Sequence, residues 1–179
     1  FLLTCLHVIY TKPMENLLIR QVQLADAQRI TEIYNPYITG STITFEEEPV
    51  TAEEIQRRIG SILSIPLPWL CAMYEETLIG YAYASRWRER SAYRFVAETT
   101  IYMDSRYSGQ GFGVELYREL LNQVKKAGIR IAIGVIALPN PSSVTLHEKL
   151  GFIKAGHFSR VGYKFEQWVD VGYWHCFLQ

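Results

Sequence analysis

The sequence has 179 residues, of which 49% are hydrophobic, so it is long enough for one globular domain with a sizeable core. Eighteen basic residues balance eighteen acidic ones, and a zero net charge offers no electrostatic case for binding nucleic acid or an anionic membrane. Three widely spaced cysteines (Cys5, Cys71 and Cys176) form no C-x-x-C pair, which argues against a zinc site and for reduced thiols in a cytoplasmic protein.

The N-terminal run of residues 1–10 is apolar but too short to span a bilayer. It also lacks the basic start and the small-residue cleavage site of a signal peptide, and Met14 is a candidate native start. We therefore expect residues 1–16 to be an N-terminal extension that is non-native or disordered, with an extra strand packed on the domain or on a partner as the alternative. Residues 17–179 are predicted to form the domain itself.

The first half of that domain predicts a strand, two helices and a hairpin. Residues 17–22 favour a strand, and Asp26 is positioned to cap a helix that ends near Gly40. A second helix should begin after Thr51, because Thr51 and Glu54 have the spacing of a capping box. Two apolar strands, residues 69–74 and 78–84, are then predicted to pair around the turn Glu75-Glu76-Thr77.

The centre of the sequence is a strand followed by glycines and a helix. Residues 95–103 are dense in β-branched and aromatic residues, which favours a strand. Gly109, Gly111 and Gly113 follow, and a helical apolar period then continues to Gly128. The free N–H groups and the positive dipole end of such a helix suit an anion, most often phosphate. The spacing fits neither a dinucleotide-binding fingerprint nor a P-loop, so a tight structural turn is the alternative.

The last third predicts a buried strand, a short helix and a hairpin. Residues 130–137 are continuously apolar, which is typical of a strand buried on both faces. Asn140 to Ser143 reads as a turn into a helix that carries His147. Residues 157–178 alternate in hydrophobicity and should close the sheet as a hairpin.

Residues 97–117 resemble motif A of the GNAT acetyltransferases, and residues 134–152 resemble motif B. The segments 41–45, 97–102, 146–152 and 162–164 with 168–172 resemble the phosphinothricin and methionine sulfoximine acetyltransferases of that family. The likeness extends from residue 19 to the C-terminus. It implies an α/β (α+β) GNAT fold, in which a mixed, mostly antiparallel central sheet has helices on both faces and a splayed strand pair holds acetyl-CoA.

The resemblance implies acetyl-CoA as co-substrate and no metal. It places the coenzyme on the central strand, the glycine loop and the turn before the last helix. The predicted coenzyme-binding residues are Ile101, Tyr102, Met103, Gly109, Gln110, Gly111, Phe112, Gly113, Val114, Asn140 and Ser143. The family motif has Gln or Arg where this chain has Ser108, and Arg106, two residues earlier, is a candidate substitute. Because backbone N–H groups provide most pyrophosphate contacts in such loops, we expect weaker coenzyme affinity at most.

Glu98 and His147 are the predicted catalytic residues. Glu98 lies in an otherwise apolar and hydroxylic strand, where partial desolvation raises a carboxyl pKa and suits a general base. Its position also matches the family's glutamate; the alternative is a surface-facing side chain. His147 occupies the slot at which many relatives have a tyrosine that is proposed to protonate the leaving thiolate. A histidine there can be catalytic or structural.

The resemblance implies a small free amino acid analogue as acceptor and a homodimer. Arg88 is our choice to bind its carboxylate or phosphinate, with Arg90 and Arg94 as alternates. The predicted substrate-binding residues are Phe45, Arg88, Glu89, Arg90, Glu98, Thr99, Thr100 and Asn140. Two alternatives stay open: a GNAT enzyme that acetylates a polyamine, aminoglycoside or protein N-terminus, and a non-catalytic acyl-CoA sensor. The presence of both Glu98 and His147 argues against the sensor.

Overall fold

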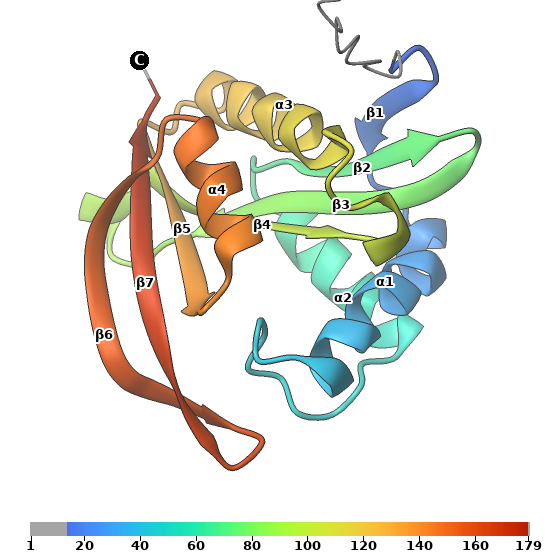
Figure 1. Cartoon of the computed structure of the whole chain (residues 1–179). Helices are drawn as coiled ribbons and strands as arrows, with labels where there is room; N and C mark the ends of the chain where they lie inside the picture. Colours follow the sequence, from blue (N-terminus) through green and yellow to red (C-terminus); the bar gives the residue numbers. More distant parts are fainter. Residues whose placement is uncertain (1–13, 179) are drawn as a thin grey trace, which may run out of the picture.

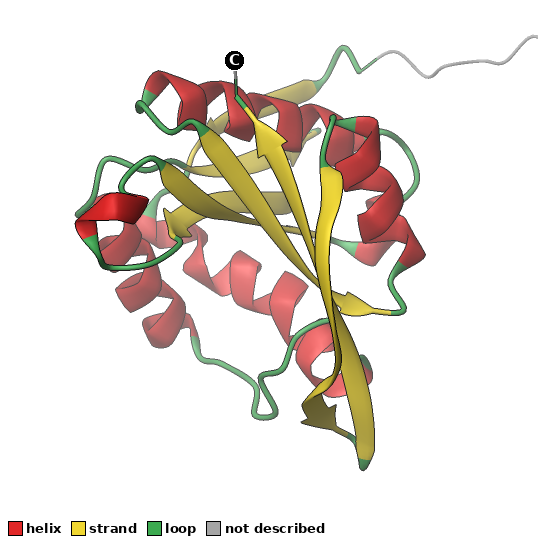
Figure 2. Ribbon diagram, turned by 90° about the vertical axis from the view of Figure 1, so that its left-hand side faces the viewer, coloured by secondary structure: helices red, strands yellow, loops and turns green. Residues whose placement is uncertain are grey.

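The computed structural model describes residues 14–178, so most of the predicted N-terminal extension lies outside the described residues. One mixed sheet of seven strands, in the order β1-β2-β3-β4-β5-β7-β6, forms the centre of the fold (Figures 1 and 2). Its strands are β1 (Leu17–Gln21), β2 (Trp69–Tyr74), β3 (Thr77–Arg86), β4 (Val96–Met103), β5 (Ile131–Leu138), β6 (Ile153–Lys164) and β7 (Gln167–Phe177). All neighbouring strands are antiparallel except β4 and β5.

Helices cover both faces of this sheet, as Figure 1 shows. Helices α1 (Ala27–Gly40) and α2 (Ala52–Leu63) lie on one face, and α3 (Phe112–Lys126) and α4 (Pro141–Lys149) lie on the other. The predicted mixed sheet with helices on both faces is therefore confirmed. Within the described residues, no helix is both long and apolar enough to cross a membrane.

Each layer of helices buries its own apolar stripe against the sheet. On the α3 face, Leu116, Leu120 and Val124 are fully buried, in agreement with the helical period expected from the sequence. On the opposite face, Ile30 of α1 and Ile59 of α2 are fully buried against the aromatic side chains of β2 and β3. Two apolar cores therefore sandwich the middle strands and hold them in fixed positions.

Local signals set most element ends as expected, with one correction. The Thr51 hydroxyl accepts the N–H of Glu54 at 3.2 Å, as the capping box predicts. Asp26 does not cap α1 with its side chain; its carboxylate instead accepts the N–H of Gln23 and pairs with Arg20. Residues 42–45 form a loop.

The pairing of β4 with β5 is short, and this determines where a ligand can enter. Only residues 96–98 of β4 pair with β5, where their partners are residues 131–133. Beyond this point β5 stays paired with β7 on its other side. On its other side β4 stays paired with β3 up to Met103. The β5-facing edge of β4 from Thr99 onward is therefore left without a neighbouring strand, as the predicted splayed pair requires.

Candidate active site

A cleft of about 920 Å³ opens where β4 and β5 separate. The end of β4, the glycine loop, the second half of β5, the start of α4 and the loop after α1 all line it. These elements are far apart in the sequence, so the fork in the sheet is what brings them together. The unpaired edge of β4 offers main-chain N–H and C=O groups to a ligand, in the way that a sheet edge accepts an added strand.

The glycine loop forms one end of this cleft. Gly109 and Gly111 have positive φ angles of 75° and 93°, a conformation that side chains with a Cβ rarely adopt. Gly111 is the N-cap of α3, and Gly111, Gly113 and Val114 line the cleft. The free N–H groups at the start of this helix therefore face the cleft. This end of the cleft therefore suits the pyrophosphate of a coenzyme.

Two predicted residues of the loop lie differently from the rest. The Phe112 ring is buried and packs on Tyr74, with ring centroids 4.9 Å apart, so only its backbone is available to a ligand. Gln110 is exposed and donates its amide to the main-chain oxygen of Arg106 at 3.1 Å. Neither residue lines the cleft.

Arg106 holds the start of the glycine loop and does not line the cleft. Its guanidinium pairs with Asp104 at 2.6 Å, and Arg29 of α1 binds the same carboxylate. The carboxylate of Asp104 accepts hydrogen bonds from the side chain and the main-chain N–H of Arg106 and from the side chain of Arg29. These bonds hold the pKa of Asp104 well below its ordinary value, although burial opposes the change. Ser108, at the slot where the family has Gln or Arg, does line the cleft.

The free end of β4 forms the cleft's long side. Ile101, Tyr102 and Met103 all line it, as the prediction for the coenzyme arm requires. The Tyr37 hydroxyl donates to the Met103 carbonyl at 2.6 Å. Tyr37 itself lines the cleft. Its role at the cleft could not be read from the sequence, because it depends on where α1 crosses β4.

Glu98 lies at the base of the fork. It is the last residue of β4 that pairs with β5, and its half-buried side chain lines the cleft. Burial raises the pKa of its carboxyl, and the positive charge of Arg88 partly opposes that rise. Among the cleft-lining residues of the described chain, Glu98 is the sole carboxylate. The carboxyl therefore meets a general base's two requirements, access to the cleft and a raised pKa.

His147 also reaches the cleft, but both of its ring nitrogens have internal partners. Nδ1 lies 2.7 Å from the Ser143 carbonyl, and Nε2 lies 3.0 Å from the Tyr117 hydroxyl. That hydroxyl lies 2.6 Å from the Thr99 hydroxyl, which also reaches the carbonyl of Ile133 at 3.2 Å. Burial lowers the pKa of His147, although the hydrogen bond to Ser143 opposes this. We therefore assign a neutral ring with the proton on Nδ1.

The predicted acceptor-binding residues divide into two groups. Phe45, Thr99, Thr100 and Asn140 line the cleft together with Glu98. Arg88, Glu89 and Arg90 are exposed on the loop after β3 and do not line it. The Arg88 guanidinium instead stacks on its neighbour Trp87, 4.7 Å from the ring centroid. Sequence reasoning missed several other cleft-lining residues, among them the aromatic residues Tyr37, Tyr83 and Tyr107.

Polar contacts also order the coenzyme-side turn. The Asn140 side chain accepts the Ser143 N–H at 3.1 Å and so caps α4. Asn140 and Ser143 both line the cleft, where the coenzyme-binding prediction places them. Among the described residues, no cluster of His, Cys, Asp or Glu could hold a metal ion.

The acetyltransferase (GNAT) domain family matches residues 19–172 of this chain. The phosphinothricin N-acetyltransferase of Streptomyces viridochromogenes is 38% identical over 91% of this chain and 87% of its own length. The L-methionine sulfoximine/L-methionine sulfone acetyltransferase of Pseudomonas aeruginosa is 30% identical over 86% of this chain and 90% of its own length.

Solved structures give the same picture. A phosphinothricin acetyltransferase from Sinorhizobium meliloti, solved with acetyl-CoA, superposes with a TM-score of 0.86 at 36% identity and covers 90% of this chain and 88% of its own. An acetyltransferase from Salmonella typhimurium, also solved with acetyl-CoA, gives 0.88 at 26% identity, over 92% and 95% of the two chains.

Proposed function

Because the chain belongs to the GNAT family of acetyltransferases, we propose that it moves the acetyl group of acetyl-CoA to the amino group of a small amino acid analogue. The acceptors we expect are of the phosphinothricin, methionine sulfoximine or methionine sulfone type, on which its relatives are named to act. One observation carries the chemistry: the carboxyl of Glu98 enters the same cleft as the open helix N-terminus and the unpaired edge of β4.

Acetyl-CoA fits this cleft from the glycine loop toward Glu98. The free N–H groups of residues 109–113 would bind its pyrophosphate, since the N–H of Val114 already donates to the Gly111 carbonyl at 3.0 Å. The pantetheine arm would run along Ile101 to Met103 with main-chain hydrogen bonds. Asn140 and Ser143 lie on the facing side of the cleft. The coenzyme supplies the acetyl group as a thioester.

Glu98 then serves as the general base. An amine reaches the enzyme as an ammonium ion and must lose a proton before its lone pair can attack the thioester carbonyl. Glu98 takes this proton, directly or through a water molecule, because its raised pKa keeps the carboxylate basic. A main-chain N–H of β4 would stabilise the oxyanion of the tetrahedral intermediate. Its collapse breaks the C–S bond and releases the CoA thiolate, and the second proton of the nitrogen passes through solvent to that thiolate, which leaves the amide and the CoA thiol.

The role of His147 as proton donor to that thiolate stays a prediction. The ring carries its proton on Nδ1, which already donates to the Ser143 carbonyl, so donation would require that hydrogen bond to break. The Ser143 hydroxyl lies 3.3 Å from the same nitrogen and also lines the cleft. The effect on turnover of substituting His147 therefore has to be compared with the effect of substituting the residues to which it is hydrogen-bonded.

The charge of the cleft favours an amino acid analogue over a polyamine. A polyamine site needs several carboxylates, whereas Glu98 is the one acidic residue among the described lining residues and Lys149 is basic. We keep Arg88 as the proposed carboxylate ligand, since its charge already acts on Glu98. The loop that carries it would have to bring the guanidinium into the cleft.

Release of the CoA thiol with wild type, Glu98→Gln and the exposed-turn control Glu76→Gln tests this proposal. The acceptors would be phosphinothricin, methionine sulfoximine, methionine sulfone, ordinary amino acids and spermidine. We expect turnover of the analogues, lost in Glu98→Gln and partly recovered at high pH, where the amine deprotonates by itself. Turnover of spermidine alone would refute the acceptor class. Tight acetyl-CoA binding without turnover of any amine would favour the sensor.

A further inference from the structure

The loop between α1 and α2, residues 41–51, forms one wall of the proposed acceptor site. Ile43, Thr44 and Phe45 of this loop line the cleft together with Glu98. A surface loop is usually the most mobile part of a fold. Whether this loop is held in place therefore decides whether the acceptor site has a defined size.

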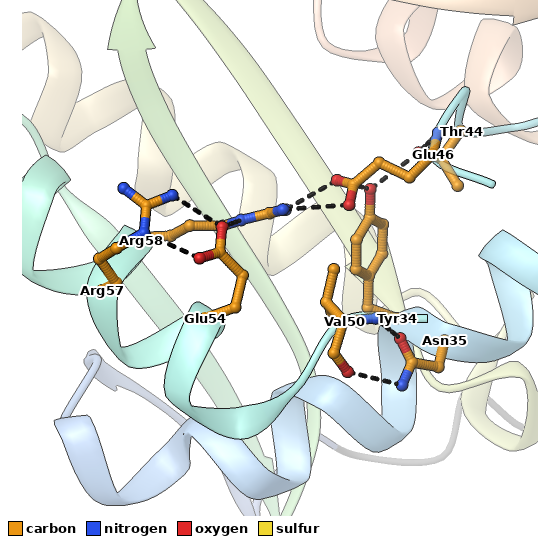
Figure 3. A network of polar contacts seen from close by, with 8 residues as sticks. All are labelled: Tyr34, Asn35, Thr44, Glu46, Val50, Glu54, Arg57 and Arg58. Atoms are coloured by element: carbon orange, nitrogen blue, oxygen red, sulfur yellow. Dashed lines mark hydrogen bonds and ion pairs between the residues drawn. The ribbon is translucent and has the colours of Figure 1, made fainter. Parts of the chain in front are cut away.

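Side chains of α1 and α2, the helices on either side of this loop in the sequence, make hydrogen bonds to it (Figure 3). The Tyr34 hydroxyl of α1 lies 2.7 Å from the Thr44 hydroxyl and donates to the Glu46 carboxylate at 2.8 Å. Arg58 of α2 binds the same carboxylate through two N–H groups, at 2.7 and 3.0 Å. Hydrogen bonds from Arg58 lower the pKa of Glu46, so the pair stays charged at neutral pH.

A lysine from the far end of the chain makes a second attachment. Lys164, the last residue of β6, is 1% exposed, which is rare for a lysine. Its ammonium donates to the carbonyl of Ile38 in α1 at 2.7 Å and to the carbonyl of Thr44 at 2.8 Å. Burial lowers the pKa of this ammonium, and the charges of Glu46 and Glu47 oppose the change. A buried charge with two main-chain acceptors ties the end of the hairpin to the loop.

A third contact lies two residues earlier on the same strand. A Cβ on Gly162 would overlap the ring of Phe45, so the ring occupies space that is free only because residue 162 is a glycine. The end of the β6–β7 hairpin therefore meets the loop at two points: at the ring of Phe45 and at the carbonyl of Thr44. These two residues are neighbours in the wall of the cleft.

We propose that Lys164 is a positioning residue that fixes the Thr44–Phe45 wall and thereby limits the acceptor site to small amines. The inference rests on the proposed function, because it assigns this wall to the acceptor. Lys164 does not line the cleft and would act only through the loop. Without the ammonium, the two carbonyls lose their donor and the wall gains freedom to move outward.

The test compares Lys164→Met with Lys154→Met, which removes an exposed lysine from the same strand. We expect Lys164→Met to raise the acceptor KM by about tenfold, since small displacements of a binding wall have effects of this order or larger. The KM for acetyl-CoA should change less than about twofold, and bulkier amino acids should gain relative to small ones. Hydrogen exchange of residues 41–46 should accelerate without any substrate present.

Unchanged acceptor KM, selectivity and exchange in folded Lys164→Met would overturn the inference. Equal losses for both substrates would also overturn it, because they would indicate a general structural role. An inactive wild type would instead refute the proposed function, and the exchange measurement would still judge the attachment of the loop.

Gly162→Ala and Phe45→Ala provide a second route if Lys164→Met does not fold. Gly162→Ala should displace the Phe45 ring and alter acceptor selectivity, while the same change in a Phe45→Ala background should have little further effect. Additive effects of the two substitutions would contradict a wall that acts through this ring.

Discussion

Nε2 of His147 lies 3.0 Å from the hydroxyl of Tyr117, and both side chains are buried between α3 and α4 at the fork of the sheet. A Cβ on Gly134 of β5 would overlap the imidazole, so the ring occupies the space that this glycine leaves. Tyr117 in turn bonds Thr99 of β4. The pair therefore connects the two diverging strands through a polar contact within an apolar layer.

Tyr117→Phe tests whether this connection matters. The ring and its stacking on Phe152 remain, while Nε2 of His147 and the Thr99 hydroxyl lose a buried partner. We expect a loss of about 1–3 kcal/mol in the free energy of unfolding, measured by urea denaturation. If the chain of hydrogen bonds also positions the fork, kcat should fall to a similar extent in Tyr117→Phe and His147→Gln. A large fall in His147→Gln alone would favour the proton-donor role.

The pH dependence of kcat/KM should report the carboxyl of Glu98. A general base is active only above its pKa, where it is deprotonated. Burial raises the pKa of Glu98 above that of an ordinary glutamate. As the pH is lowered, kcat/KM should therefore begin to fall at a higher pH than the titration of an ordinary glutamate would give. Glu98→Gln should lower kcat by about 10²–10⁴-fold and remove this limb of the profile. A mutant that keeps the limb would assign it to another group.

Deprotonation of the Glu98 carboxyl, which activates it as a base, should lower the stability of the protein. Because its folded-state pKa is raised, the contribution of Glu98 to stability is full below the unfolded pKa and is lost as the pH rises through the folded one. Glu98→Gln should therefore be more stable than wild type at pH 7 to 8, with the difference shrinking toward pH 4. Thermal unfolding across this range measures it; a constant difference would indicate a packing effect instead.

The glycine loop offers a matched pair of substitutions. Gly111→Ala places a Cβ at a φ of 93°, which costs roughly 1–2 kcal/mol and distorts the helix N-terminus, so acetyl-CoA affinity should fall by about tenfold or more in calorimetry. Gly60→Ala adds a Cβ in open space inside α2 and should stabilise the protein by about 0.5–1 kcal/mol without affecting coenzyme binding. Equal acetyl-CoA affinity in both variants would contradict the proposed pyrophosphate site.

Local sequence signals were sufficient to predict the order and type of the main helices and strands. Helical periods, the Thr51 cap and the glycines around Gly111 are local signals, because a helix or turn depends on residues a few positions apart. The motifs around Glu98 and His147 likewise identified the family, and the family match confirms it. Placing Ile101 and Asn140 in one cleft followed from that resemblance rather than from any local rule.

Which of those side chains face the cleft, and which bind other residues instead, depends on how the elements pack in three dimensions. Arg106 pairs with Asp104, and Arg88 stacks outside the cleft, although either could have bound an anion as judged from the sequence. Lys164 lies in a segment that resembles the family, but the contacts of its ammonium with carbonyls 120 and 126 residues away could not be predicted from that resemblance. Such pairings depend on where separate elements pack in three dimensions, and burial rather than local pattern makes them stable.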